Sequence, residues 1–122
     1  MITLPHPCDV QVATSHPDVE RFRGAYWRAL FLRGRFLRVR QSTLDTFDTV
    51  TSKTAVADRI RERAYRRYET VKAALAEAEA PLPDLESAAL RVDRDATARA
   101  RLSMEARAAN LARERAADAS KN

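Results

Sequence analysis

The sequence predicts an all-α protein: a small helical bundle with a long C-terminal antiparallel helical hairpin and an irregular N-terminal arm. Only two of the 122 residues are glycine, and long stretches consist of Ala, Arg, Glu and Leu, which are strong helix formers. Apolar residues also recur every three or four positions along most of the chain. At this length, with 45% hydrophobic residues, the chain fits a single domain (residues 1–122) with one core.

Residues 1–15 form the predicted arm. They contain Pro5 and Pro7 and a brief alternation of Val10 and Val12, which fits a short extended segment but cannot make a sheet by itself. We therefore expect no helix before residue 16.

The first helix is predicted to begin near Pro17, because Ser15 can cap it, proline is favoured in a first turn and Asp18 complements the helix dipole. Its apolar face has helical spacing and comprises Phe22, Tyr26, Ala29, Leu30, Phe36 and Leu37, widened by Trp27 and Phe31. Gly34 predicts an end or kink, and the alternative is a helix that continues to about Arg40.

Residues 42–53 are rich in Thr, Ser and Asp, which compete with helical hydrogen bonds. Leu44, Phe47 and Val50 nevertheless share one helical face, so we expect a separate short helix of about three turns. Together, residues 16–80 make the predicted basic, aromatic-rich helical core.

A long amphipathic helix is predicted from about Thr54 to Ala80. Pro81 and Pro83 stop it, and an alanine-rich helix (residues 84–116) is expected to return beside it, followed by a frayed tail (117–122). The two arms would be on the order of 40 and 50 Å long. That is longer than a domain of this size needs, which leaves a homodimer open. Because its apolar face is mostly alanine, we expect the last helix to add little to the core.

Catalytic and metal-binding signatures are scarce. The two histidines, His6 and His16, lie in or beside the arm, and Cys8 is the only cysteine. A structural zinc site needs four ligands at recognisable spacing, so we predict no metal. The sequence has no phosphate-binding glycine loop and no hydrolase motif. We predict no enzyme activity, no cofactor and no small-molecule substrate; an enzyme would require isolated side chains to converge in a pocket.

The basic residues are distributed unevenly. The formal net charge is +5, and the whole excess lies in residues 1–72. Arginine outnumbers lysine by 19 to 3, a bias that either phosphate binding or a GC-rich coding genome would produce. Two ridges of helical spacing carry the candidate binding residues: Arg28, Arg33, Arg35, Arg38 and Arg40 in the first, and Arg59, Arg63, Arg66 and Arg67 in the second.

These ridges predict a non-catalytic helical binding protein whose basic helices contact the backbone of DNA or RNA. The alternative is a protein-interaction module, such as an adaptor, inhibitor or assembly subunit, whose arginines dock on an acidic protein surface. A lone cysteine, with no signal-like or membrane-spanning run, leads us to expect a cytoplasmic location and no membrane partner.

Overall fold

The computed structural model describes residues 16–120, so the predicted arm (1–15) and the last two residues lie outside the described range. The described chain forms four helices and no strand: α2 (Pro17–Thr49), α3 (Ala55–Glu79), α4 (Leu82–Val92) and α5 (Arg94–Ser120). The predicted all-α class is confirmed. None of these helices combines the length and the apolar character that crossing a membrane would require.

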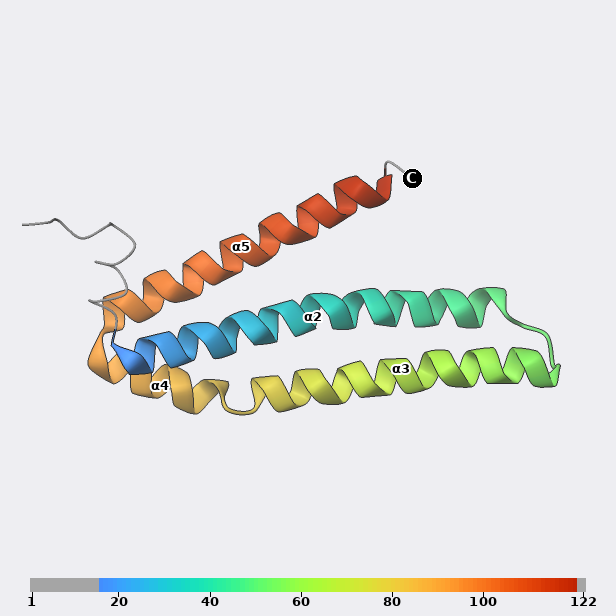
Figure 1. The fold of residues 1–122 in the computed structure, drawn as a ribbon, viewed down its shortest axis with the longest axis horizontal. Coiled ribbons are helices and arrows are strands. Elements are labelled where there is room, and N and C mark those ends of the chain that lie inside the picture. The colour runs from blue at the N-terminus through green and yellow to red at the C-terminus, as the bar shows by residue number, and fades with distance from the viewer. Residues whose placement is uncertain (1–15, 121–122) are drawn as a thin grey trace, which may run out of the picture.

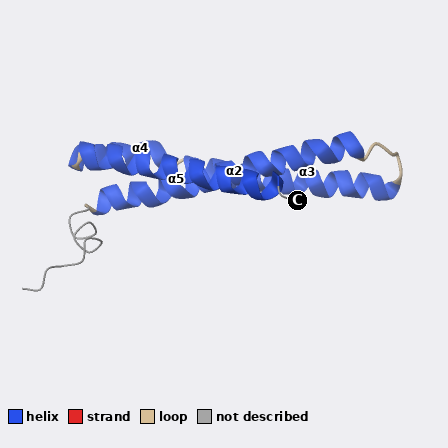
Figure 2. Cartoon of the chain, turned by 90° about the horizontal axis from the view of Figure 1, so that it is seen from above, coloured by secondary structure: helices blue, strands red, loops and turns tan. Residues whose placement is uncertain are grey.

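Helix α2 is the central element, since it contacts each of the other three helices. In Figure 1, α3 runs antiparallel to α2, α4 continues in the direction of α3, and α5 returns on the other side of α2 and diverges from it toward the C-terminus. Figure 2 shows the same elongated arrangement from above. The far ends of α2 and α3 project beyond the end of α5 (Figure 1).

The predicted end or kink at Gly34 is wrong, because α2 is continuous through it. Gly34 has no positive φ and occupies an ordinary helical position. Beyond it, Val39 and Thr43 are buried, and burial of this kind offsets the cost of about 1 kcal/mol for a glycine within a helix.

Residues 42–49 are the last turns of α2, so the expectation of a separate short helix is also wrong. The hydroxyl groups of Thr43, Thr46 and Thr49 donate to carbonyl oxygens four residues back, at 2.8, 2.9 and 2.8 Å. These hydroxyl groups therefore bond within the helix instead of ending it.

The C-terminal part of the chain reverses between α4 and α5 (Figure 1), where Asp93 is the joining residue, whereas the sequence placed this reversal at Pro81 and Pro83. Asp93 has an extended backbone, and its carboxylate accepts a hydrogen bond from the backbone N–H of Ala96 at 3.0 Å, which caps α5. Consequently α3 pairs with α2, and the C-terminal hairpin turns between α4 and α5. Helix α5 continues to Ser120, so residues 117–120 are helical rather than frayed.

The main core lies where α2, α4 and α5 meet. Its buried members are Val19, Phe22, Tyr26, Ala89, Ala100 and Met104. The alanine-rich segment thus contributes substantially, contrary to the sequence-based expectation. Ala89 and Ala100 are almost completely buried, and their small side chains let the helices approach closely around the two aromatic rings.

The α2–α3 hairpin has thinner packing, with Val39, Thr43, Ala57, Val71 and Leu75 buried along its length. Toward its tip, large apolar side chains remain exposed, including Leu44 (47%), Val56 (62%) and Ile60 (46%).

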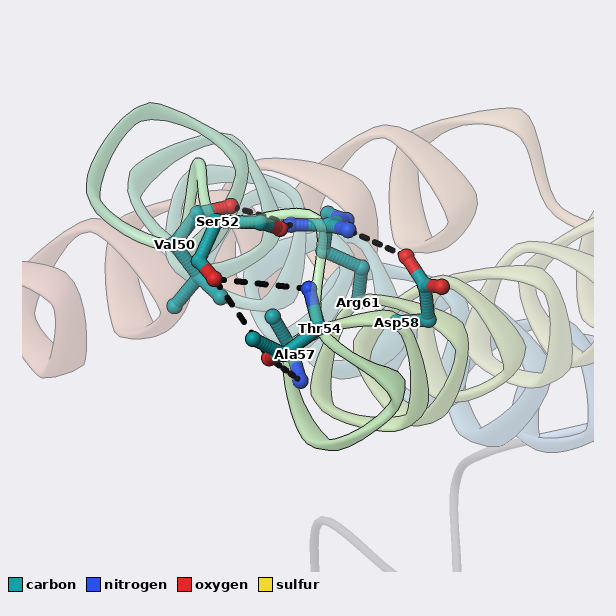
Figure 3. A network of polar contacts seen from close by, with 6 residues as sticks. All are labelled: Val50, Ser52, Thr54, Ala57, Asp58 and Arg61. Atoms are coloured by element: carbon teal, nitrogen blue, oxygen red, sulfur yellow. Dashed lines mark hydrogen bonds and ion pairs between the residues drawn. The ribbon is translucent and has the colours of Figure 1, made fainter.

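A polar network holds the loop that joins α2 to α3 (Figure 3). The guanidinium of Arg61 donates to the carbonyl oxygens of Val50 and Ser52 at 2.7 and 2.9 Å and pairs with Asp58. Thr54 caps α3 by accepting a hydrogen bond from the backbone N–H of Ala57 at 3.1 Å. Arg61 therefore stabilises the loop between α2 and α3.

Candidate nucleic-acid interface

A groove of about 440 Å³ lies between the outer parts of α2 and α3. Arg59, Arg63 and Arg67 line it from α3, where their spacing of four residues places them on one side of the helix, about 6 Å apart along its axis. Its remaining lining residues are Val39, Ser42, Thr43, Thr46, Val56, Ile60 and Ala64. The groove therefore combines a basic row with small polar and apolar side chains.

A second hollow continues this groove toward the middle of α2. It shares Val39, Ser42 and Arg67 with the first and adds Phe31, Arg35 and Arg38. Two helices that are distant in sequence thus bring five arginines to one continuous surface. We call this surface the basic groove and define it by Arg35, Arg38, Arg59, Arg63 and Arg67.

Among the residues that the structure describes, no carboxylate lines the basic groove. Within residues 16–120, none of its five arginines takes part in an ion pair. Burial, with Arg115 and Arg35 nearby, lowers the pKa of Arg38 from its ordinary value. Like charges repel at such spacing, so the groove is a concentrated positive region that an anion would stabilise.

The other four predicted binding residues lie elsewhere. Arg33 pairs with Glu79 at 3.1 Å and Arg66 with Glu62 at 2.5 Å, so their charges are already compensated. Arg28 is exposed on α2 and lines neither hollow of the basic groove. Arg40 belongs to a different hollow. Of the nine arginines in the two predicted ridges, five therefore line the basic groove and four do not.

That different hollow also lies between α2 and α3 and shares only Thr43 with the basic groove. Its volume is about 220 Å³, and we call it the apolar groove. Its lining residues are Arg40, Thr43, Leu44, Phe47, Tyr65 and Tyr68. The aromatic residues here were expected in a core, yet Phe47 and Tyr65 are 40% and 51% exposed.

Arg115 is a residue that the sequence analysis missed. Its guanidinium carbon lies 5.6 Å from the centre of the Phe31 ring, and it lines a small hollow together with Arg38. No spacing rule relates α5 to the middle of α2. Only the packing of the two helices brings this arginine to the end of the basic groove.

The candidate metal ligands can be placed only in part, because His6 and Cys8 lie outside the described residues. The Nδ1 atom of His16 accepts a hydrogen bond from the backbone N–H of Asp18 at 3.1 Å and so caps α2. Between residues 16 and 120, no three His, Cys, Asp or Glu side chains gather as a metal ion would need.

Comparison with known proteins found no matching family model, no matching curated protein and no matching solved structure.

Proposed function

We propose that this protein is a non-catalytic binding protein whose basic groove contacts the phosphate backbone of nucleic acid. The observation that carries the proposal is the convergence of five arginines, from two helices, on a groove that no carboxylate of residues 16–120 lines. A guanidinium fork can donate two hydrogen bonds to the oxygens of one phosphate, as it can to those of a carboxylate. A row of such groups at one-turn spacing can neutralise successive phosphates and release their counterions.

Fluorescence anisotropy with labelled DNA and RNA, single-stranded and duplex, tests the proposal. Five phosphate contacts predict that affinity for duplex DNA falls by a few hundred-fold between about 50 and 200 mM salt. Reversing Arg59, Arg63 and Arg67 to Glu should abolish binding while leaving helicity intact, as circular dichroism would show.

The matched control reverses Arg91, Arg94 and Arg99 to Glu. These arginines are exposed and lie outside the basic groove. Because both variants reverse three arginines, they have the same net charge. It should lose some long-range attraction but keep binding. Absence of binding by the unmodified protein even at low salt, or equal loss in the two variants, would exclude the basic groove as a nucleic-acid site.

The apolar groove favours a second candidate function, a protein-interaction module. Its exposed Leu44, Phe47 and Tyr65 flank Arg40, a combination of aromatic, aliphatic and arginine side chains that is typical of protein interfaces. In this alternative the arginines dock on an acidic protein surface. This alternative would be supported if the protein bound a labelled acidic peptide but no nucleic acid, and if Leu44→Glu abolished binding of the peptide.

A further inference from the structure

The basic groove does not end at α2. The hollow that contains Arg35 and Arg38 and the hollow that contains Arg115 share two lining residues, Phe31 and Arg38. Phe31 is 42% exposed and lies beneath the guanidinium of Arg115. The basic surface therefore passes from α3 across α2 to α5 without interruption.

The outer part of α5 is weakly held. From Ala112 to Ser120 every residue is exposed, and the helix diverges from α2 in this region (Figure 1). The contact of Arg115 with Phe31 is the last aromatic contact along α5 that the structure describes. It places Arg115 near Arg38, whose charge opposes that of Arg115, and Arg35 repels Arg38 as well.

We infer that a phosphate of the bound nucleic acid lies between Arg115 on α5 and Arg35 and Arg38 on α2, and that this phosphate holds the outer part of α5 against α2. The inference rests on the proposed function of the basic groove. Arg38 shares one hollow with Arg35 and the other with Arg115, and among residues 16–120 no carboxylate lines either hollow. A bridging anion turns their mutual repulsion into attraction. Nucleic-acid binding and docking of α5 are therefore coupled.

Arg115→Gln tests the coupling, with Arg113→Gln as the matched control. Arg113 lies on the same helix and bonds within it, donating to the side-chain oxygen of Asn110 at 3.0 Å. Both variants lose one positive charge, but only Arg115 lies at the junction. In the anisotropy titration, Arg115→Gln should lower the slope of log affinity against log salt by about one unit, whereas Arg113→Gln should change it less.

Hydrogen exchange measured by mass spectrometry gives the second readout. Saturating labelled DNA or RNA should slow exchange over residues 106–120 in the unmodified protein and in Arg113→Gln, but not in Arg115→Gln.

Two results would overturn the inference and are distinguishable. If nucleic acid binds, and reversal of Arg59, Arg63 and Arg67 abolishes binding, but Arg115→Gln leaves both the salt slope and the exchange of α5 unchanged, the bridge is wrong and the proposed function stands. If no nucleic acid binds the unmodified protein, the proposed function and the bridge both fail.

Discussion

Tyr26 occupies the point where α2 meets α5. Its hydroxyl group donates to a carboxylate oxygen of Glu105 at 2.5 Å, and Arg101 bonds the same oxygen at 3.2 Å and Glu86 at 2.8 Å. Burial, together with this hydrogen bond, raises the pKa of Tyr26. The hydrogen bond from Tyr26, followed by that from Arg101, lowers the pKa of Glu105 from its ordinary value. This polar cluster joins three helices beside the core.

The depressed pKa of Glu105 predicts a pH-dependent contribution to stability. Because the folded-state pKa lies below the unfolded one, the contribution is fully present above the unfolded pKa and disappears as pH falls through the folded pKa. Glu105→Gln should therefore have a lower free energy of unfolding than the unmodified protein at pH 7, and this difference should shrink as the pH falls through the folded-state pKa of Glu105. Urea unfolding at several pH values measures this difference.

Glu114→Gln is the control for this experiment, since Glu114 is exposed on the same helix and takes no part in the described ion pairs. The role assigned to the Tyr26–Glu105 hydrogen bond would be contradicted if the loss in free energy of unfolding caused by Glu105→Gln did not change with pH. It would also be contradicted if Glu114→Gln caused the same loss.

Helix α2 is the element on which the whole arrangement depends. At 33 residues it is about 50 Å long. Its first half forms the core with α4 and α5, while its second half supplies one wall of the basic groove. Gly34 lies between the two halves, and because α2 is helical through it, the core and the groove share one continuous helix.

Gly34→Ala should stabilise the protein by roughly 0.5 to 1 kcal/mol, because alanine favours the helix and restricts the unfolded chain. A Cβ atom there would meet only Nη1 of Arg38 at 3.5 Å, an ordinary contact. Thermal and urea unfolding measure the change. Gly24→Ala is the companion variant, since its Cβ would meet nothing within 4 Å. If Gly24→Ala stabilises the protein and Gly34→Ala destabilises it, α2 is not a regular helix at Gly34.

At the scale of the whole molecule, the projecting tip of the α2–α3 hairpin leaves apolar surface without cover. The described chain turns α5 away from it (Figure 1), and Leu37, Leu44, Phe47 and Tyr65 remain exposed. Leu37 and Leu44 are seven residues apart on one side of α2, a spacing typical of helix-pairing seams. Two copies of the hairpin placed side by side would form a four-helix bundle that buries this surface in both.

We therefore expect a homodimer in solution. Multi-angle light scattering over micromolar concentrations should give twice the 13.8 kDa mass of the chain, and Leu44→Glu should return it to one copy. Leu102→Glu is the control, because Leu102 is 66% exposed on α5, away from the tip. A strict monomer throughout this range would contradict the expectation.

Sequence patterns predicted the parts of the fold that depend on neighbouring residues. The starts of α2 and α3 follow from caps and turn residues near Pro17 and Thr54, and the stop after Glu79 follows from Pro81 and Pro83. Residue type and helical spacing together also selected the nine candidate arginines. Asp93 carried a similar local signal that was overlooked, since an aspartate cap with an acid two residues later is typical of a helix start.

The remaining features depend on contacts between residues far apart in the chain. Gly34 stays helical because both halves of α2 pack against other helices. α3 pairs with α2 because the chain reverses in the loop at residues 50–54 and does not reverse again until Asp93. Among nine candidate arginines, five share a groove because α2 and α3 lie antiparallel. Two of the others, Arg33 and Arg66, form ion pairs with Glu79 and Glu62. Local propensity specifies that helices form and where they stop, but which faces meet depends on the burial of side chains from the entire molecule.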